Sequence, residues 1–237
     1  MCGIFGQISK TSVNKKNLRM IVKHSEQRGV DSSGLIHRKG SAYQVDRADI
    51  NVEKLLGKVN PFNSNVVLGH SRLITNGLGD NQPIVKDNLC VIHNGIIVNE
   101  KEVWGNLESK RELKIDSEAI VAIASEHFKN GGDISDVSNK ILSLCRGVVA
   151  CALFVPELGK IVLFSNNGSL YTGIIDDDIY FASEKYPLGQ IECEKIKQIK
   201  NEAYLIDIPK SDIQLKVTDI STRKENLIPE FCFNKEQ

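Results

Sequence analysis

The chain has 237 residues, and its 30 Lys and Arg residues balance its 30 Asp and Glu residues, so the formal net charge at pH 7 is zero. Hydrophobic residues make up 41% and charged residues 25%, which is typical of a globular protein and excludes intrinsic disorder. Because neither charge sign dominates, we expect no nucleic-acid partner. No apolar run approaches the ~20 residues of a membrane span, so we expect no membrane partner either.

The N-terminus and the cysteines favour a cytoplasmic location. The chain opens without a basic leader or a long apolar segment, so we expect no secretory signal. Its six cysteines form no CxxC pair, and most are expected to be reduced, buried thiols. Cys2, directly after Met1, is the exception that suggests chemistry.

All the predicted helices lie before residue 147. Apolar spacing predicts a helix at 14–27, with Asn14 as its N-cap and Gly29 beyond its end. Asn99 and Glu102 have the spacing of a capping box at the start of another helix. The clearest helical pattern covers 116–129, and a further one covers 134–144.

Strands are predicted in both halves. In the first half they cover 3–9, 33–37, 42–47, 66–73, 89–93 and 95–98. In the second half they cover 147–155, 161–165, 170–174, 179–182, 196–199 and 203–208. This order favours packed sheets covered by helices. No linker or repeat divides the chain, so we expect one domain over 1–237, with a core at 2–225 and a tail at 226–237.

Several kinds of site lack sequence support. The five histidines stand far apart and show no metal-ligand spacing with the cysteines, so no metal site is predicted. No Walker loop and no dinucleotide-binding GxGxxG follows a strand, so no cofactor is predicted.

Cys2 has two interpretations. Removal of Met1, which a small second residue permits, would give Cys2 a free α-amine with a pKa of about 7.7–8.0. A thiol and an amine on one residue form a compact nucleophile and base, as in enzymes with an N-terminal Thr. The alternative is a buried cysteine that begins a strand.

Five segments, in this order, decide between the two. They are CGIFG at 2–6, RGVDSSG at 28–34, GHSRLITNG at 69–77 with NQP at 81–83, VIHNGII at 91–97, and DSE at 116–118. Together they resemble the glutaminase domain of class II glutamine amidotransferases. The resemblance covers roughly the first half of the chain, and the second half agrees only in being rich in strands. It implies an α+β, N-terminal-nucleophile (Ntn) hydrolase fold, a four-layer αββα sandwich of two mostly antiparallel sheets flanked by helices.

The candidate substrate residues match the charges of glutamine. The Arg72 guanidinium suits the α-carboxylate, which it can bind as a bidentate fork. Asp116 suits the α-ammonium, although it is equally a candidate N-cap of the helix at 116–129. Thr75 could add a hydroxyl hydrogen bond to the carboxylate. In the family, the matching Arg, Thr and Asp positions bind glutamine in this way.

Asn94-Gly95 also has two interpretations. Locally, an Asn-Gly pair between apolar runs predicts a tight hairpin. The resemblance instead implies an oxyanion hole made by the Asn94 amide and the Gly95 backbone N–H. Arg28 and Asp31 are expected to order the pocket around Cys2, with Asn76 and His93 as further supporting residues. On general grounds, His93 and His70 are expected to be histidines with satisfied hydrogen bonds.

The predicted function is a glutaminase that acts through a Cys2 thioester and supplies ammonia to a separate synthase. The acceptor is not fixed by the motif variants. We see no sugar-isomerase domain, phosphoribosyltransferase domain or ATP-pyrophosphatase loop after 226–229. Three alternatives remain: an Ntn amidase for another amide, a catalytically silent regulatory or binding subunit, and a piece of a longer fused enzyme. Arg72 and Asp116 argue against the first, because they suit an amino-acid head group.

Overall fold

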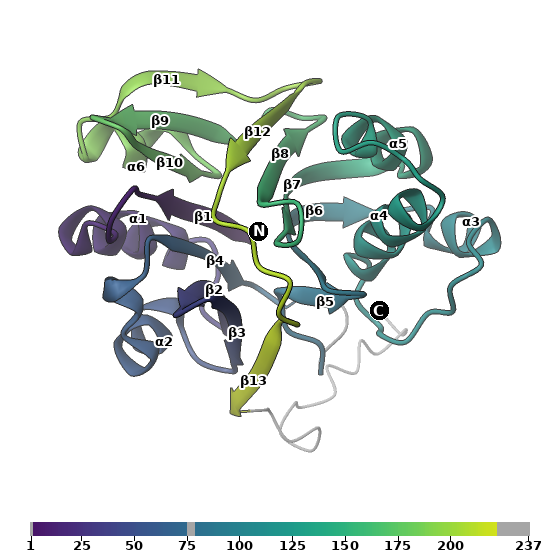
Figure 1. The fold of residues 1–237 in the computed structure, drawn as a ribbon, viewed down its shortest axis with the longest axis horizontal. Helices are drawn as coiled ribbons and strands as arrows, with labels where there is room; N and C mark the ends of the chain where they lie inside the picture. Colours follow the sequence, from purple (N-terminus) through teal and green to yellow (C-terminus); the bar gives the residue numbers. More distant parts are fainter. Residues whose placement is uncertain (1, 75–78, 222–237) are drawn as a thin grey trace, which may run out of the picture.

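The computed structural model describes residues 2–74 and 79–221, and these form two stacked sheets with helices on both outer faces (Figure 1). The first sheet has the strand order β11-β9-β10-β1-β4-β2-β3-β13, and the second has the order β12-β8-β7-β6-β5. All pairs are antiparallel except β13 with β3. The predicted α+β, four-layer arrangement is confirmed.

The strands and helices have the following bounds. The first sheet contains β1 (Gly3–Ile8), β2 (Ser32–Lys39), β3 (Ala42–Ala48), β4 (Val66–Arg72), β9 (Tyr171–Ile175), β10 (Asp178–Ala182), β11 (Glu194–Gln198) and β13 (Lys216–Ser221). The second contains β5 (Ile84–Lys86), β6 (Leu89–Ile97), β7 (Gly147–Val155), β8 (Lys160–Ser165) and β12 (Ala203–Asp207). The helices are α1 (Lys15–Glu26), α2 (Val52–Val59), a 3₁₀ turn η1 (Pro61–Asn63), α3 (Glu100–Gly105), α4 (Glu118–Lys129), α5 (Val137–Leu144) and α6 (Lys185–Gln190).

Alternation along the strands divides the core into three layers. In β1, Ile4 faces the second sheet, whereas Phe5 packs under α1 with Leu18. In β6, Ile92 faces the first sheet, whereas Val91 packs under the helices α4 and α5. Each sheet therefore buries both of its faces, which explains why its strands are apolar at successive positions.

Most predicted elements are confirmed within a few residues. Asn14 caps α1, and its side chain accepts hydrogen bonds from the backbone N–H groups of Lys16 and Asn17. The helix expected at 116–129 begins at Glu118. The prediction missed α2, α6, β5 and β13. A signal for α2 was present, because Asn51 caps an apolar spacing of Val52, Leu55 and Leu56.

Two local interpretations are wrong. Asn94-Gly95 forms no hairpin, because β6 runs straight through it and pairs with β7. The capping box at Asn99 does not form: Asn99 precedes α3, but its side chain accepts from Arg146 N and donates to Leu144 O. In both cases a partner distant in sequence replaces the local one.

Among the described residues, no helix is long and apolar enough to cross a membrane. The one-domain boundaries stay a prediction, and the tail at 226–237 lies outside the described residues.

Candidate active site

Cys2 lies immediately before β1, an interior strand of the first sheet. Its thiol donates to the backbone oxygen of Leu73, at an Sγ–O distance of 3.8 Å. Arg28, which follows α1, donates from Nε to the Cys2 carbonyl at 2.7 Å. Cys2 is thus held through both its side chain and its backbone by two segments that the sequence analysis singled out.

The surroundings of Cys2 shift the pKa of its thiol. Burial raises this pKa above its ordinary value, and the Asp116 carboxylate adds to the rise. The Leu73 backbone and the Arg72 charge act in the opposite direction. Cys2, Arg72 and Asp116 therefore lie within electrostatic reach of one another, although 114 residues separate the first from the last.

Arg72 ends β4 and is only 2% exposed. Its Nη1 donates to the Asp80 carbonyl, and burial lowers the pKa of its guanidinium. Asp31 fixes the same segment twice: its N–H donates to Arg72 O at 3.0 Å, and its carboxylate accepts from Ile74 N at 2.8 Å. Gly29 lies so close that a Cβ there would be 2.3 Å from the carbonyl carbon of Arg72. The 28–34 segment thus supports Arg72 as well as Cys2.

Asp116 does not cap α4. Ser117 occupies the N-cap position, and the Asp116 carboxylate accepts the Ile97 N–H at 2.8 Å. The carboxylate of Asp80 fixes the preceding segment, because it accepts from Lys114 N at 2.6 Å and from Ile115 N at 3.2 Å. The helix-cap interpretation of Asp116 is therefore wrong, and its buried charge stays available to a ligand.

Asn94 and Gly95 lie inside β6, on the second sheet. Asn94 is 6% exposed, and its Nδ2 donates to Ser183 Oγ at 3.4 Å. Because Val98 N donates to Arg146 O, the alternation of an antiparallel ladder directs the Gly95 N–H away from β7.

The open edge of β6 is closed by side chains on both sides of Gly95. Gln82 pairs with the backbone of His93, accepting from its N at 2.6 Å and donating to its O at 3.0 Å. Asp116 takes the Ile97 N–H. Among the described residues we find no acceptor for the Gly95 N–H between them. Two donors on neighbouring residues, one amide and one backbone N–H, are what an oxyanion hole requires.

The absence of a side chain at Gly95 has a further cause. A Cβ at this position would lie 1.9 Å from the backbone oxygen of Val148 on β7. A missing Cβ would also let a reacting carbonyl approach the Gly95 backbone closely. The structure shows that strand packing alone already demands it.

The remaining candidates separate into three outcomes. His93 is buried, with Nδ1 bonded to Ser117 Oγ at 2.9 Å and Nε2 to Val148 O at 3.2 Å, as expected of a core histidine. His70 differs from expectation, because neither ring nitrogen has a hydrogen-bond partner among the described residues. Burial lowers the pKa of His70 to about 3, so it is neutral. Thr75 and Asn76 lie outside the described residues.

Sequence reasoning gave no role to Gln82, Ser183 and Glu184. Gln82 lay within a quoted motif, but its bonds to His93 depend on a fold that brings 82 beside 93. Ser183 and Glu184 follow β10 in the second half, where no motif was found, and only the pairing of β10 with β1 places them beside Cys2. A cleft of about 490 Å³ adjoins this position and is lined by His24, Gln27, Arg28, Gly29, Val30, Leu73 and Glu184.

Comparison with solved structures identifies the class of fold. The chain resembles glutamine phosphoribosylpyrophosphate amidotransferase from B. subtilis with a TM-score of 0.69 at 19% identity, over 87% of this chain and 47% of that one. It also resembles a glutamine aminotransferase class-II domain protein from Silicibacter pomeroyi with a TM-score of 0.53 at 12% identity, over 87% of this chain and 99% of that one. The fold is that of the Ntn hydrolases.

Sequence comparison identifies the family within this class. Residues 70–190 match the glutamine amidotransferase domain, and the chain belongs to that family. A glutamine–fructose-6-phosphate aminotransferase from Helicobacter pylori is 28% identical over 226 residues, which cover 85% of this chain and 38% of that protein. The corresponding protein from Thermococcus kodakarensis is 28% identical over 198 residues, which cover 78% of this chain and 32% of that protein. The chain thus spans 32% to 38% of the length of these relatives.

Proposed function

We propose that this protein hydrolyses the side-chain amide of glutamine, with Cys2 as the N-terminal nucleophile. One observation carries the proposal. The Cys2 thiol and the Arg72 guanidinium lie close enough to shift each other's pKa, and the Asp116 carboxylate shifts the pKa of both. The family supports the same conclusion, because its members are glutamine amidotransferase domains.

The charges select an amino-acid substrate. Arg72 would bind the α-carboxylate of glutamine, and its burial strengthens that attraction because little water screens it. Asp116 would bind the α-ammonium with a carboxylate that is only 4% exposed. Thr75 is proposed as a second donor to the carboxylate, and Asn76 as a pocket residue.

The proposed reaction uses one residue as nucleophile and base. The Cys2 thiol gives its proton to its own α-amine, and the sulfur attacks the δ-carbon of glutamine. Asn94 Nδ2 and the Gly95 N–H stabilise the oxyanion that forms. The C–N bond then breaks as the protonated amine returns its proton to the leaving group, which departs as ammonia. Water cleaves the thioester, which restores the thiol and releases glutamate.

We further propose that the ammonia is delivered to a separate synthase that aminates a sugar phosphate. Two of the similar proteins are named as fructose-6-phosphate aminotransferases, and this chain corresponds to two fifths of their length or less. The glutamine aminotransferase class-II domain protein from Silicibacter pomeroyi resembles this chain over 99% of its own length.

The central test is glutamate release from glutamine by the wild type and by Cys2→Ala, after intact mass has shown that Met1 is removed. We expect Cys2→Ala to abolish release, whereas Cys193→Ala, a matched change at a half-buried thiol outside the site, retains it. Equal rates in wild type and Cys2→Ala would refute the proposal. Absence of activity in the wild type would instead favour a silent binding subunit.

A further inference from the structure

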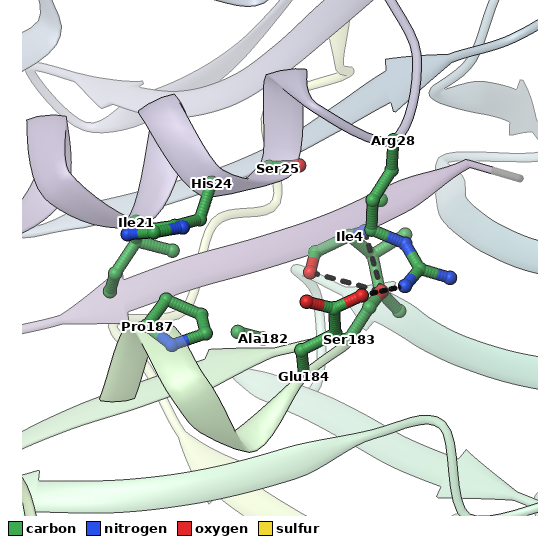
Figure 2. A pocket seen from close by; sticks show the side chains of 10 residues that line it. Ile4, Ile21, His24, Ser25, Arg28, Ala182, Ser183, Glu184 and Pro187 are labelled. Carbon is green, nitrogen blue, oxygen red and sulfur yellow. Dashed lines mark hydrogen bonds and ion pairs between the residues drawn. The ribbon is translucent and has the colours of Figure 1, made fainter. Parts of the chain in front are cut away.

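Ser183 and Glu184 follow β10 and contact Ile4 and Arg28 (Figure 2). Ser183 also contacts Asn94 of the second sheet. We propose that these two residues are positioning residues that fix Cys2 relative to Asn94. The proposal rests on the proposed glutamine hydrolysis and adds to it a pair of groups that never touch the substrate.

Ser183 completes the strand pairing beside the nucleophile. The regular ladder between β1 and β10 ends at the pair Phe5 and Ala182. One residue further, the Ser183 N–H donates to Ile4 O at 3.0 Å, and Ser183 Oγ accepts the Ile4 N–H at 2.9 Å. One serine thus satisfies both backbone groups of Ile4, two residues from Cys2.

The same hydroxyl reaches the other sheet. Asn94 Nδ2 donates to Ser183 Oγ at 3.4 Å. An amide nitrogen carries two hydrogens, so one is held by Ser183 and the direction of the other is thereby set. Ser183 Oγ therefore contacts both Ile4 and Asn94. This one atom links β1, which directly follows Cys2, to the side chain proposed to bind the oxyanion.

Glu184 acts on Cys2 through Arg28. Its carboxylate forms an ion pair with Nη1 of Arg28 (Figure 2). Nε of the same arginine donates to the Cys2 carbonyl at 2.7 Å. The Arg28 side chain is 13% exposed and that of Glu184 is 48% exposed. A partly exposed pair of this kind contributes little to overall stability. The ion pair instead fixes geometry, because the Glu184 carboxylate holds the Arg28 guanidinium against the backbone carbonyl of Cys2.

The cavity that Ser183 lines is too small for a ligand, although Glu184 also borders the cleft of about 490 Å³ described above. The cavity that Ser183 and Glu184 line with Ser25 and His24 has a volume of about 10 Å³, room for at most one water molecule. Their polar atoms are instead directed at Ile4, Asn94 and Arg28. This arrangement fits residues that position other residues.

The first test is a mutant cycle between Ser183 and Asn94. We expect Ser183→Ala to lower kcat for glutamine hydrolysis about tenfold and to leave KM within twofold, because substrate contacts are unchanged. In an Asn94→Ala background the same change should cost less than twofold, since the residue it orients is absent. Ser183→Thr, which keeps the hydroxyl, should recover most of the rate. Ser143→Ala removes an exposed hydroxyl of α5 and serves as control.

The second test is a cycle between Glu184 and Arg28. Glu184→Ala should lower kcat about fivefold relative to the wild type. Added to Arg28→Ala, it should leave kcat equal to that of Arg28→Ala alone. Glu202→Ala breaks the comparable exposed ion pair with Lys197 and should leave kcat unchanged. Thermal unfolding of every variant shows whether a loss of rate reflects loss of folded protein.

The outcomes separate this inference from the proposed function. The positioning roles would be overturned if kcat of the single variants stays within twofold of the wild type. They would also be overturned if each substitution lowers kcat by the same factor in the double variant as it does alone. Glutamine hydrolysis would stand in both cases. If the wild type does not hydrolyse glutamine, alkylation of Cys2 by iodoacetamide, located by mass spectrometry, decides instead. We expect at least threefold faster alkylation in Ser183→Ala and Glu184→Ala, because a released Cys2 is less buried. Rates equal to those of Ser143→Ala and Glu202→Ala would overturn the inference.

Discussion

On the first sheet, Cys2 and Arg72 lie at strand ends and are held by backbone and side-chain groups of neighbouring segments, whereas on the second sheet Asn94 and Gly95 lie within a paired strand. The first-sheet side (Cys2, Arg28 and Arg72) is bordered by exposed groups, among them the half-exposed Glu184 side chain. On the second-sheet side (Asn94, Gly95 and Asp116), the polar side chains of Asn94 and Asp116 are only 6% and 4% exposed, whereas Gly95 is exposed.

This difference indicates how the two sides tolerate change. Buried polar groups cost about 1–3 kcal/mol when a hydrogen-bond partner is removed, so the second-sheet side is expected to be rigid. On the first-sheet side Arg72 is also buried, but the ion pair of Arg28 with Glu184 is partly exposed, so its removal is expected to affect position more than folding. The predictions below test this division by changing one residue on either side at a time.

The largest effect is expected on the second-sheet side, at Asn94. Asn94→Ala removes one proposed oxyanion donor, so kcat for glutamine should fall roughly 100- to 1,000-fold, about 2.7–4 kcal/mol of barrier stabilisation. KM should change little, because the donor acts mainly in the transition state. Steady-state glutamate release measures both, and Asn63→Ala, at an exposed asparagine of η1, is the control. A KM effect without a kcat effect would remove Asn94 from the oxyanion role.

The next effect is expected on the first-sheet side, at Arg72. Arg72→Ala should raise KM for glutamine at least about tenfold, a loss of roughly 1.4 kcal/mol. Arg72→Lys keeps a charge but not the bidentate fork, so its KM should lie between those of Arg72→Ala and the wild type. Arg146→Ala, at an exposed arginine paired with Glu102, should leave KM unchanged. An unaltered KM in Arg72→Ala would assign the carboxylate to another residue.

Asp116→Asn separates charge from hydrogen bonding on the second-sheet side. The amide oxygen can still accept the Ile97 N–H, so the thermal unfolding midpoint should change little. The lost charge should raise KM for glutamine roughly five- to tenfold through weaker binding of its ammonium. Competition by glutamine analogues that lack the α-amine tests the assignment directly. If the affinity for such analogues falls from wild type to Asp116→Asn by the same factor as the affinity for glutamine, Asp116 does not bind the ammonium.

The sequence predicted the elements of the fold better than their connections. Elements with a strong pattern, such as the apolar run of β7 and the helical spacing of α1, were predicted within a residue or two. The errors at Asn94-Gly95 and Asn99 share one cause: each has a strong local turn or cap preference that a distant strand or backbone group overrides. Pairing partners of this kind, such as Gln82 with His93, depend on the order of strands in the sheet, which periodicity does not encode.

The candidate site divides in the same way. Cys2, Arg72 and Asp116 could be named because each has a charge or a nucleophile that glutamine chemistry needs, and because their motifs occur in a recognisable order. Ser183 and Glu184 could not, since a Ser-Glu pair after a strand has no chemical signature by itself. Their importance arises only where β10 lies beside β1 and the α1 end brings Arg28 to Cys2.

The smallest expected effect is a shift in the titration of Cys2, which both sides influence with opposite sign. Arg72 lowers the pKa of the Cys2 thiol and Asp116 raises it, so Arg72→Gln should move the midpoint of Cys2 alkylation to higher pH, and Asp116→Asn should move it to lower pH. At a fixed pH below the midpoint, the thiolate fraction and the alkylation rate should therefore fall in the first variant and rise in the second. The rate of iodoacetamide labelling as a function of pH measures both. Shifts of the same sign would show that the two variants act by altering burial of Cys2, and the opposed-charge account of the two sides would then fail.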